Sequence, residues 1–276
     1  MSATATATRS APAPASGSRL RWAFSDAVAV TKRNLIHYVR VPELLIFSTI
    51  QPVMFVLLFV FVFGGAIRIP GISYKDYLMP GILVQTAVFG AVQTGIGLAD
   101  DLSRGMIDRF RSLPMARSAV LAGRTASDTV RNLFVILLMS GVGYLVGARF
   151  HGGLLGVLAG FALALLFGLA FSWISAFIGM TLKDTEAVQA ASFIWIFPLT
   201  FASSAFVGVQ QMPGWLQAWA KANPVSITVD ALRDLMLGTD VTHHSLRFDL
   251  FWSAVWIAGI LAVFVPLAVT RYRKAA

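Results

Sequence analysis

The charged residues whose types and spacing could support a binding or chemical function lie mainly in one stretch, Asp100–Arg131. Its first part, Asp101–Leu113, predicts an amphipathic helix, because apolar side chains recur at helical spacing and charged side chains occupy the other faces. The apolar positions are Leu102, Met106, Phe110 and Leu113, and the charged ones are Arg104, Asp108, Arg109 and Arg111. Asp100 and Asp101 would begin this helix, where the helix dipole favours negative charge. Such a helix either lies on lipid headgroups, held by its arginines, or docks a cytoplasmic partner.

Other chemistry is sparse in this sequence. The adjacent His243 and His244 could ligate a metal, but two neighbouring histidines are weak ligands, and a solvated loop is the better interpretation. There is no cysteine, so disulfides, thiolate metal sites and Cys nucleophiles are excluded. No Gly is followed by Lys, so the chain has no P-loop. We therefore expect no enzyme activity and no bound cofactor or metal, and any ATP hydrolysis must occur in another polypeptide.

The composition is that of a membrane protein. Hydrophobic residues make up 57% of the chain, charged residues only 13%, and the mean hydropathy is +0.74, whereas soluble domains have about 25% charged residues. Six apolar stretches are long enough to cross about 30 Å of hydrocarbon as helices. We predict an all-α integral membrane protein with spans near residues 44–63, 78–98, 132–148, 154–180, 187–209 and 250–270. Residues 1–19 should be a disordered cytoplasmic tail, and residues 20–276 one membrane domain.

The positions of Lys and Arg predict the orientation. With these spans, sixteen of the 22 basic residues fall on the face that holds both termini, and six fall on the other. By the positive-inside rule, both termini are cytoplasmic. The formal charge of +9 therefore reflects cytoplasmic loops, and we expect no nucleic-acid partner. The predicted place of the chain is the cytoplasmic (inner) cell membrane.

Two further amphipathic regions flank the predicted spans. An interfacial helix is expected around Leu20–Val41, broken by Pro42, which restarts a membrane helix. On the outer face, Pro213–Lys221 and Val225–Leu237 predict two short helices, the second closed by Gly238. The tryptophans of the first helix suggest a re-entrant-like hairpin at the outer membrane boundary.

Two loop motifs resemble those of a known family. One is DLSRGMIDRFRSLPMAR at residues 101–117, followed by Gly123-Arg124. The other is MPGWLQAW at residues 212–219, which continues through Asn223-Pro224 to Ala231-Leu232-Arg233 and Gly238. Both resemble type 2 ABC exporter permeases, most closely the daunorubicin/doxorubicin-resistance type. The resemblance extends from the N-terminal amphipathic helix to the C-terminal tail.

The resemblance implies a six-span permease that pairs with a second copy of itself or a homologous permease. Two ATP-binding-cassette subunits, which use ATP and Mg, would bind its cytoplasmic face. The helix over Asp101–Leu113 would then be the coupling helix seated in the ATPase, with contributions also from the N-terminal helix around Trp22–Arg40. The ATPase-coupling candidates are Asp101, Arg104, Asp108, Arg109, Phe110 and Arg111.

The resemblance also places the substrate path near the second and fifth spans. Gln85, Phe89 and Gln93 share one face of the second span by steps of four residues. On the fifth span the corresponding candidates are Phe193, Phe197, Thr200 and Ser204. Aromatic and amide side chains suit a large amphipathic ligand, but ordinary helix packing explains the same pattern and is favoured by the residues alone.

The function that these observations favour is the membrane subunit of an ATP-driven exporter of a hydrophobic or amphipathic compound, such as an antibiotic or a lipid. The alternative is a six-helix secondary transporter or channel. No ionisable residue lies in the core of any predicted span, which weighs against ion-coupled transport. The sequence does not identify the substrate.

Overall fold

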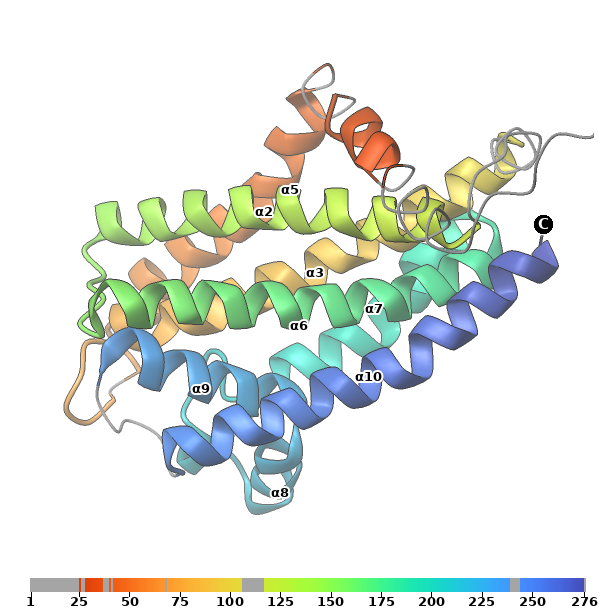
Figure 1. The fold of residues 1–276 in the computed structure, drawn as a ribbon. Coiled ribbons are helices and arrows are strands. Elements are labelled where there is room, and N and C mark those ends of the chain that lie inside the picture. The colour runs from red at the N-terminus through yellow and green to blue at the C-terminus, as the bar shows by residue number, and fades with distance from the viewer. Residues whose placement is uncertain are drawn as a thin grey trace, which may run out of the picture.

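A computed structural model describes Ser25 and residues 28–36, 40, 42–67, 69–105, 117–238 and 244–275. Within these residues all regular secondary structure is helical, which confirms the all-α prediction. The elements are α2 (Pro42–Leu57), the π-helix η1 (Leu58–Phe63), α3 (Tyr74–Ser103), α5 (Arg117–Val146), α6 (Gly153–Leu182), α7 (Thr185–Phe201), the 3-10 helix η2 (Val209–Gln211), α8 (Gly214–Ala222), α9 (Pro224–Leu237) and α10 (Leu246–Ala275). The long helices lie side by side in one bundle (Figure 1).

Four of the described helices are long and apolar enough to cross a membrane. They are α3, α5 from Leu121 onward, α6 and α10, and they coincide with the second, third, fourth and sixth predicted spans. The apolar helix over Thr49–Phe63 is shorter, and α7 has 17 residues. The structure therefore supports a multi-pass membrane protein, with four of the six predicted spans reaching full length.

The third span begins earlier than predicted. Helix α5 starts at Arg117, and its apolar part starts at Leu121, not at residue 132. Arg124, Asp128 and Arg131 therefore belong to the same helix as the third span, whereas the predicted span begins after them. The reason is that these side chains neutralise one another inside the bundle, so their charge does not end the span.

The fifth helix ends earlier than predicted. Helix α7 stops at Phe201, not at residue 209, and Ser204 lies in the irregular segment that follows. Side chains from elsewhere bind the carbonyl groups that the broken helix leaves: the Asn223 amide donates to the oxygens of Leu199 at 2.7 Å and Ala202 at 3.1 Å. Irregular backbone at membrane depth is stable only when protein groups satisfy it in this way.

Helix α3 is the centre of the bundle, and α10 is at its edge. In the most apolar window of α3, 72% of residues are buried, whereas in that of α10 only 6% are. Helices α3 and α6 approach closely at Gly95, where a Cβ would lie 2.5 Å from the carbonyl oxygen of Ser175. Small residues at such crossings allow backbone-to-backbone packing in membrane proteins. The most buried face of the molecule is therefore the face that α3 presents to α6.

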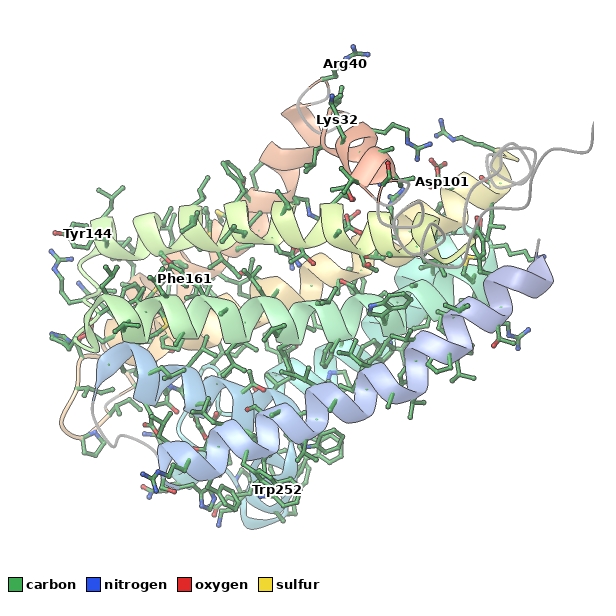
Figure 2. All side chains as sticks on the ribbon, in the orientation of Figure 1. Lys32, Arg40, Asp101, Tyr144, Phe161 and Trp252 are labelled. Carbon is green, nitrogen blue, oxygen red and sulfur yellow. The ribbon has the colours of Figure 1, made fainter. Side chains whose placement is uncertain are left out.

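The helix ends gather at two opposite ends of the bundle. We call one the tail end: it holds the end of α3, the start of α5, the α6–α7 connection and the C-terminus (Figure 1). The other, the hairpin end, holds α8, α9 and the start of α10. Asp101 lies at the tail end and Tyr144 at the hairpin end (Figure 2). The described segments around the second–third connection, the α6–α7 connection and the C-terminus, which the basic-residue count assigns to one membrane face, thus lie at the same end.

The two short helices α8 and α9 confirm the residues predicted for the outer helix pair. Asn223 caps α9, because its side-chain oxygen accepts a hydrogen bond from the backbone N–H of Val225 at 2.8 Å, and Pro224 is the first helical residue. Gly238 closes α9 with a φ of 64°, a left-handed conformation that glycine adopts without strain. The local sequence alone fixed both boundaries.

The predicted start of the helix over Asp101–Leu113 is wrong. Asp100 and Asp101 lie in the last turn of α3, which continues to Ser103. Their carboxylates do not face an N-terminal dipole, and nearby arginines stabilise them instead: Arg104 pairs with Asp100 at 2.8 Å. Residues 106–116 lie outside the described part of the chain.

Candidate functional site: a cavity beside α3

A cavity of about 590 Å³ lies among α2, α3, α5 and α7. This volume is in the range of pockets that hold drug-sized ligands. Its lining includes Gln51 and Phe55 of α2, Gln85, Phe89 and Gln93 of α3, Arg131 and Asn132 of α5, and Gln189 and Phe193 of α7. The walls thus combine aromatic rings with amides, and the charged residues lie toward the tail end, where Asp100, Arg104 and Arg124 also line the cavity.

Four of the seven predicted path residues line this cavity: Gln85, Phe89, Gln93 and Phe193. Phe197 lies next to them, because its ring centroid is 5.5 Å from that of Phe89 and 5.3 Å from that of Phe193. These three rings form an aromatic cluster between α3 and α7, with the remaining pair, Phe89 and Phe193, 6.0 Å apart. The structure brings together residues more than 100 positions apart that the sequence could only assign to separate helix faces.

The other two predicted path residues lie elsewhere. Thr200 is buried, and its hydroxyl donates to the carbonyl oxygen of Ile196 in its own helix at 2.7 Å. Ser204 takes part in a polar cluster at the hairpin end, where its hydroxyl donates to Asp230 at 2.9 Å. Neither residue lines the cavity.

Gln85 contributes a buried side-chain amide to the cavity wall. Its side chain is only 4% exposed, and its Nε2 atom has no hydrogen-bond partner among the described residues. A buried amide without a partner costs free energy, and native proteins rarely leave one so. Water or a ligand in the cavity can supply the missing partner, which makes Gln85 the residue of the wall best suited to contact a ligand.

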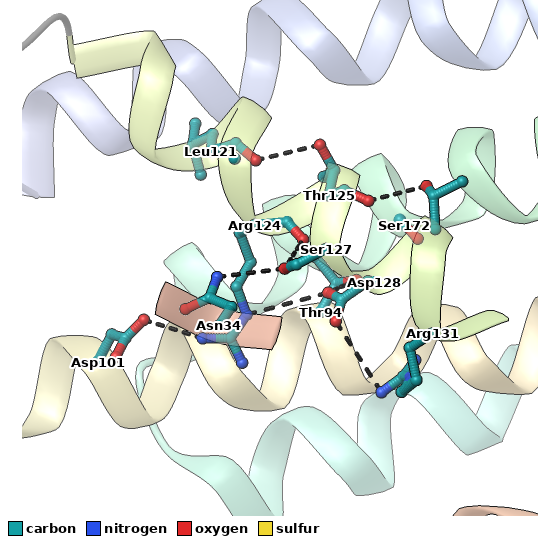
Figure 3. Close-up of polar contacts among 12 residues, drawn as sticks. Asn34, Thr94, Asp101, Leu121, Arg124, Thr125, Ser127, Asp128, Arg131 and Ser172 are labelled. Carbon is teal, nitrogen blue, oxygen red and sulfur yellow. Dashed lines mark hydrogen bonds and ion pairs between the residues drawn. The ribbon is translucent and has the colours of Figure 1, made fainter. Parts of the chain in front are cut away.

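Buried charges at the tail end of the cavity form a network that joins α3 to α5 (Figure 3). Arg124 donates to Asp101 at 3.0 Å, and its Nε atom is 3.9 Å from Asp128. The hydroxyl of Thr94 donates to Asp128 at 2.5 Å. Arg131, 3.9 Å from Asp128, donates to the carbonyl oxygen of Gly90 at 2.6 Å. Opposite charges in this network compensate one another, as charged residues inside helical membrane proteins commonly do.

The N-terminal helical segment 28–36 packs on the same turn of α5. The hydroxyl of Thr31 donates to the carbonyl oxygen of Gly123 at 3.1 Å, and the amide of Asn34 donates to the hydroxyl of Ser127 at 3.2 Å. Ser127 in turn donates to the carbonyl oxygen of Arg124 at 2.7 Å. Three parts of the chain thus meet at one helical turn.

Asp128 and Arg131 were not predicted as site residues, because the predicted third span begins after them. The available signal was their spacing: Arg124, Asp128 and Arg131 are four and three residues apart, with alternating charge, so they share one helix face. A charged face of this kind next to a long apolar run indicates a helix that continues into the protein interior.

A second arginine cluster holds the hairpin end of α3. Arg233 of α9 is 1% exposed, and its guanidinium lies 3.5 Å from the ring centroid of Tyr77. It donates to the carbonyl oxygens of Tyr77 at 3.1 Å, Ser204 at 2.6 Å and Ala205 at 3.2 Å. It also pairs with Asp230 at 2.7 Å. This cluster, the hairpin-end anchor, ties α9 and the segment after α7 to the first turn of α3.

The predicted ATPase-coupling residues are described only in part. Asp101 binds Arg124 and is turned toward α5, whereas Arg104 is exposed and pairs with Asp100 one turn earlier. Asp108, Arg109, Phe110 and Arg111 lie outside the described residues, and their role stays a prediction.

Comparison with known proteins decides the family. Residues 26–237 match the profile of the family described as ABC-2 type transporter. The chain belongs to the ABC-2 type transporter family. This ABC-2 chain is 36% identical over 246 residues to a protein of Streptomyces coeruleorubidus named daunorubicin resistance ABC transporter permease protein, covering 88% of this chain and 84% of that one.

A second relative of this ABC-2 permease is more distant. It is a protein of Mycobacterium tuberculosis named probable doxorubicin resistance ABC transporter permease protein, 27% identical over 247 residues, with 89% of this chain and 87% of that one covered. The matched region includes the cavity, the tail-end charges and the hairpin-end anchor. The resemblance inferred from the two loop motifs is thereby confirmed, and the family supports the exporter over the alternative of a secondary transporter or channel.

Proposed function

We propose that this ABC-2 permease exports a hydrophobic or amphipathic compound, a drug-like molecule or a lipid, through the cavity beside α3. The observation that carries the proposal is the cavity wall, in which the rings of Phe55, Phe89 and Phe193 line one space of about 590 Å³. Gln85 lines the same space, and its Nε2 atom has no hydrogen-bond partner among the described residues. Aromatic walls with few polar groups bind large apolar ligands and orient them through those polar groups. The names of the two relatives support a compound of the anthracycline type.

The energy for export comes from a separate ATP-binding-cassette subunit that uses ATP and Mg. The absence of a P-loop from this sequence and the permease names of its relatives support this division of labour. The ATPase would bind the tail end, where the coupling candidates lie. A second copy of the chain, or a homologous permease, would complete the path, and the remaining surface would contact membrane lipid.

A transport assay tests the proposal directly. The full chain, produced together with the ATPase that co-purifies with it, should drive ATP-dependent uptake of fluorescent daunorubicin into inside-out vesicles. Replacing Phe89 and Phe193 by Ala should lower that uptake, whereas replacing the exposed Leu155 by Ala should not. Uptake that is independent of ATP, or equal in both variants, would contradict the proposal.

The proposed placement in the cytoplasmic membrane has both termini inside. The gathering of the predicted cytoplasmic segments at the tail end supports it. A reporter fused after Ala276 should score as cytoplasmic, and one inserted at Thr242 as external. Both reporters on one side would contradict the six-span topology.

A further inference from the structure

The side chain of Arg124 lies across α3 at a position where α3 has no side chain. A Cβ on Gly97 would occupy the space of the Arg124 guanidinium, so the arginine reaches Asp101 only because residue 97 is glycine. Gly97 and Arg124 both line the tail-end part of the cavity. The position of this one guanidinium therefore determines how α3 and α5 meet at the edge of the cavity.

The two carboxylates beside Arg124 lie on different helices. Asp101 is on α3, its side chain is 17% exposed, and it accepts from Arg124 at 3.0 Å. Asp128 is on α5, the helix of Arg124 itself, is fully buried, and lies 3.9 Å from the Nε atom of Arg124. One donor of Arg124 is therefore hydrogen-bonded to a residue of α3. Its Nε donor, on the side of Asp128 in α5, has no hydrogen-bond partner among the described residues.

If Arg124 released Asp101, it would not be left without an ion-pair partner. Residues four apart on a helix are neighbours, so Arg124 can pair with Asp128 by a change of side-chain rotamer alone. Asp128 stays compensated in either arrangement, because Thr94 donates to it and Arg131 lies 3.9 Å away. Breaking a buried ion pair is costly when a charge is left unpaired, and this arrangement avoids that cost.

We propose that Arg124 is an exchangeable positioning residue between α3 and α5. Paired with Asp101, it holds the tail ends of the two helices together and closes that side of the cavity. Paired with Asp128, it frees the end of α3 and opens the cavity toward the tail end. We call Arg124, Gly97, Asp101 and Asp128 the α3–α5 clamp.

The surroundings of the clamp connect it to the rest of the tail end. Ser127 joins the backbone of Arg124 to Asn34 of the N-terminal segment, and Asp101 directly precedes the chain that leads to the remaining coupling candidates. A displacement of either segment would reach Arg124 through these bonds. The clamp goes beyond the proposed function, since it concerns a movement of this chain that is measurable without transport.

The test measures access to the cavity in the full chain. Because the sequence has no cysteine, a single Val92→Cys substitution, at a position of the cavity wall that is only 2% exposed, can be labelled without background. The rate of its modification by a charged methanethiosulfonate reagent, in lipid nanodiscs, reports opening. Gln210→Cys, an exposed site near η2 at the hairpin end, serves as the control for general reactivity.

Gly97→Ala displaces the guanidinium without changing any charge and should raise the rate at Val92→Cys by about fivefold or more, the lower range of coupling between linked sites. Asp101→Asn should do the same. Asp128→Asn removes the second partner and should lower the rate. The matched control is Gly141→Ala in α5, where a Cβ meets no atom within 4 Å, and it should change nothing.

A fixed structural ion pair makes a different prediction. Asp101→Asn and Asp128→Asn would then shift the rate in the same direction, and either that result or equal rates for Gly97→Ala and Gly141→Ala would overturn the proposal. Comparing Gly97→Ala with Gly141→Ala keeps the test decisive even if Asp128→Asn does not fold. Both variants gain helix propensity, but only Gly97→Ala displaces Arg124.

Discussion

The two ends of α3 are each held by an arginine of another helix, and the two arginines bind different kinds of acceptor. At the hairpin end, Arg233 donates to three main-chain carbonyl oxygens as well as to Asp230. At the tail end, the acceptor of Arg124 is the side-chain carboxylate of Asp101, and its Nε atom has no hydrogen-bond partner in the part of the chain that the structure describes. Arg233 is almost fully buried, whereas 16% of the Arg124 side chain is exposed.

This difference indicates which end can move. Main-chain acceptors cannot leave Arg233 unless the backbone itself rearranges, and a buried guanidinium without acceptors is strongly unfavourable. In contrast, an arginine can exchange one carboxylate acceptor on a flexible side chain for another at a small cost in free energy. We therefore expect the hairpin end to be the rigid reference of the bundle and the tail end, where the ATPase is proposed to bind, to be the part that shifts. The predictions below are ordered by their expected effect on the stability of the folded chain.

The largest effect should come from Arg233→Ala. The substitution leaves the carbonyl oxygens of Tyr77, Ser204 and Ala205 and the carboxylate of Asp230 without their donor, and it should destabilise the fold by about 3–5 kcal/mol. Arg233→Lys should recover only part of this, because an ammonium group cannot replace the planar fork. Thermal unfolding in detergent measures the effect, with the exposed Arg247→Ala as control. Equal melting temperatures for the two alanine variants would show that the hairpin end is not fixed by Arg233.

The second effect concerns the packing of α3 on α6, which both ends depend on. Gly95→Ala places a Cβ 2.5 Å from the carbonyl oxygen of Ser175, and because a backbone atom cannot rotate away, we expect a loss of about 1–3 kcal/mol. Gly141→Ala, in open space on α5, should instead gain up to about 1 kcal/mol from helix propensity. Thermal unfolding of both variants gives the sign of each change. A loss in both would mean that helix packing does not distinguish the two sites.

The sequence was sufficient where the determinants of structure are local. Asn223-Pro224 and Gly238 mark the ends of α9, and the apolar run of residues 154–180 marks α6, so these elements were predicted correctly. It was insufficient where distant residues decide the outcome. Helix α7 ends early where Asn223 donates to the carbonyl oxygen of Ala202 and Arg233 donates to those of Ser204 and Ala205. The bond from Arg233 to Tyr77 joins residues 156 positions apart.

The candidate site follows the same rule. The face of Gln85, Phe89 and Gln93 was readable by helical spacing, and these residues do line the cavity. Ser204 was placed on the same path by extending a regular helix past Phe201, where the structure has none. Thr200 does lie within α7, but it is buried and bonds to its own helix instead of lining the cavity. The buried charges of α5 were missed because their compensation by Asp101 and Thr94 of α3 is visible only once the two helices are paired.

A small effect on stability is expected for the cavity amides. Gln85→Leu with Gln93→Leu removes polar groups at similar volume. Since Gln85 Nε2 has no partner to lose among the described residues, folding should be unchanged or improved. Export should fall, and the preference should shift toward less polar compounds. Thermal unfolding beside export of two ligands of unequal polarity measures both. If these glutamines serve helix packing, stability should instead drop by about 0.6 kcal/mol with no change in preference.

The smallest effect on stability, with a large effect on transport, is expected at the tail end. Replacing Arg104, Asp108 and Arg109 together by Ala should leave the melting temperature unchanged, because Arg104 is an exposed side chain whose pair with Asp100 contributes little. Export and the stimulation of the partner ATPase should both be lost if this segment transmits the movement. Normal export by the triple variant would assign the segment to headgroup anchoring. A lowered melting temperature would contradict the comparison itself, because it would make the tail end as structurally essential as the Arg233 anchor.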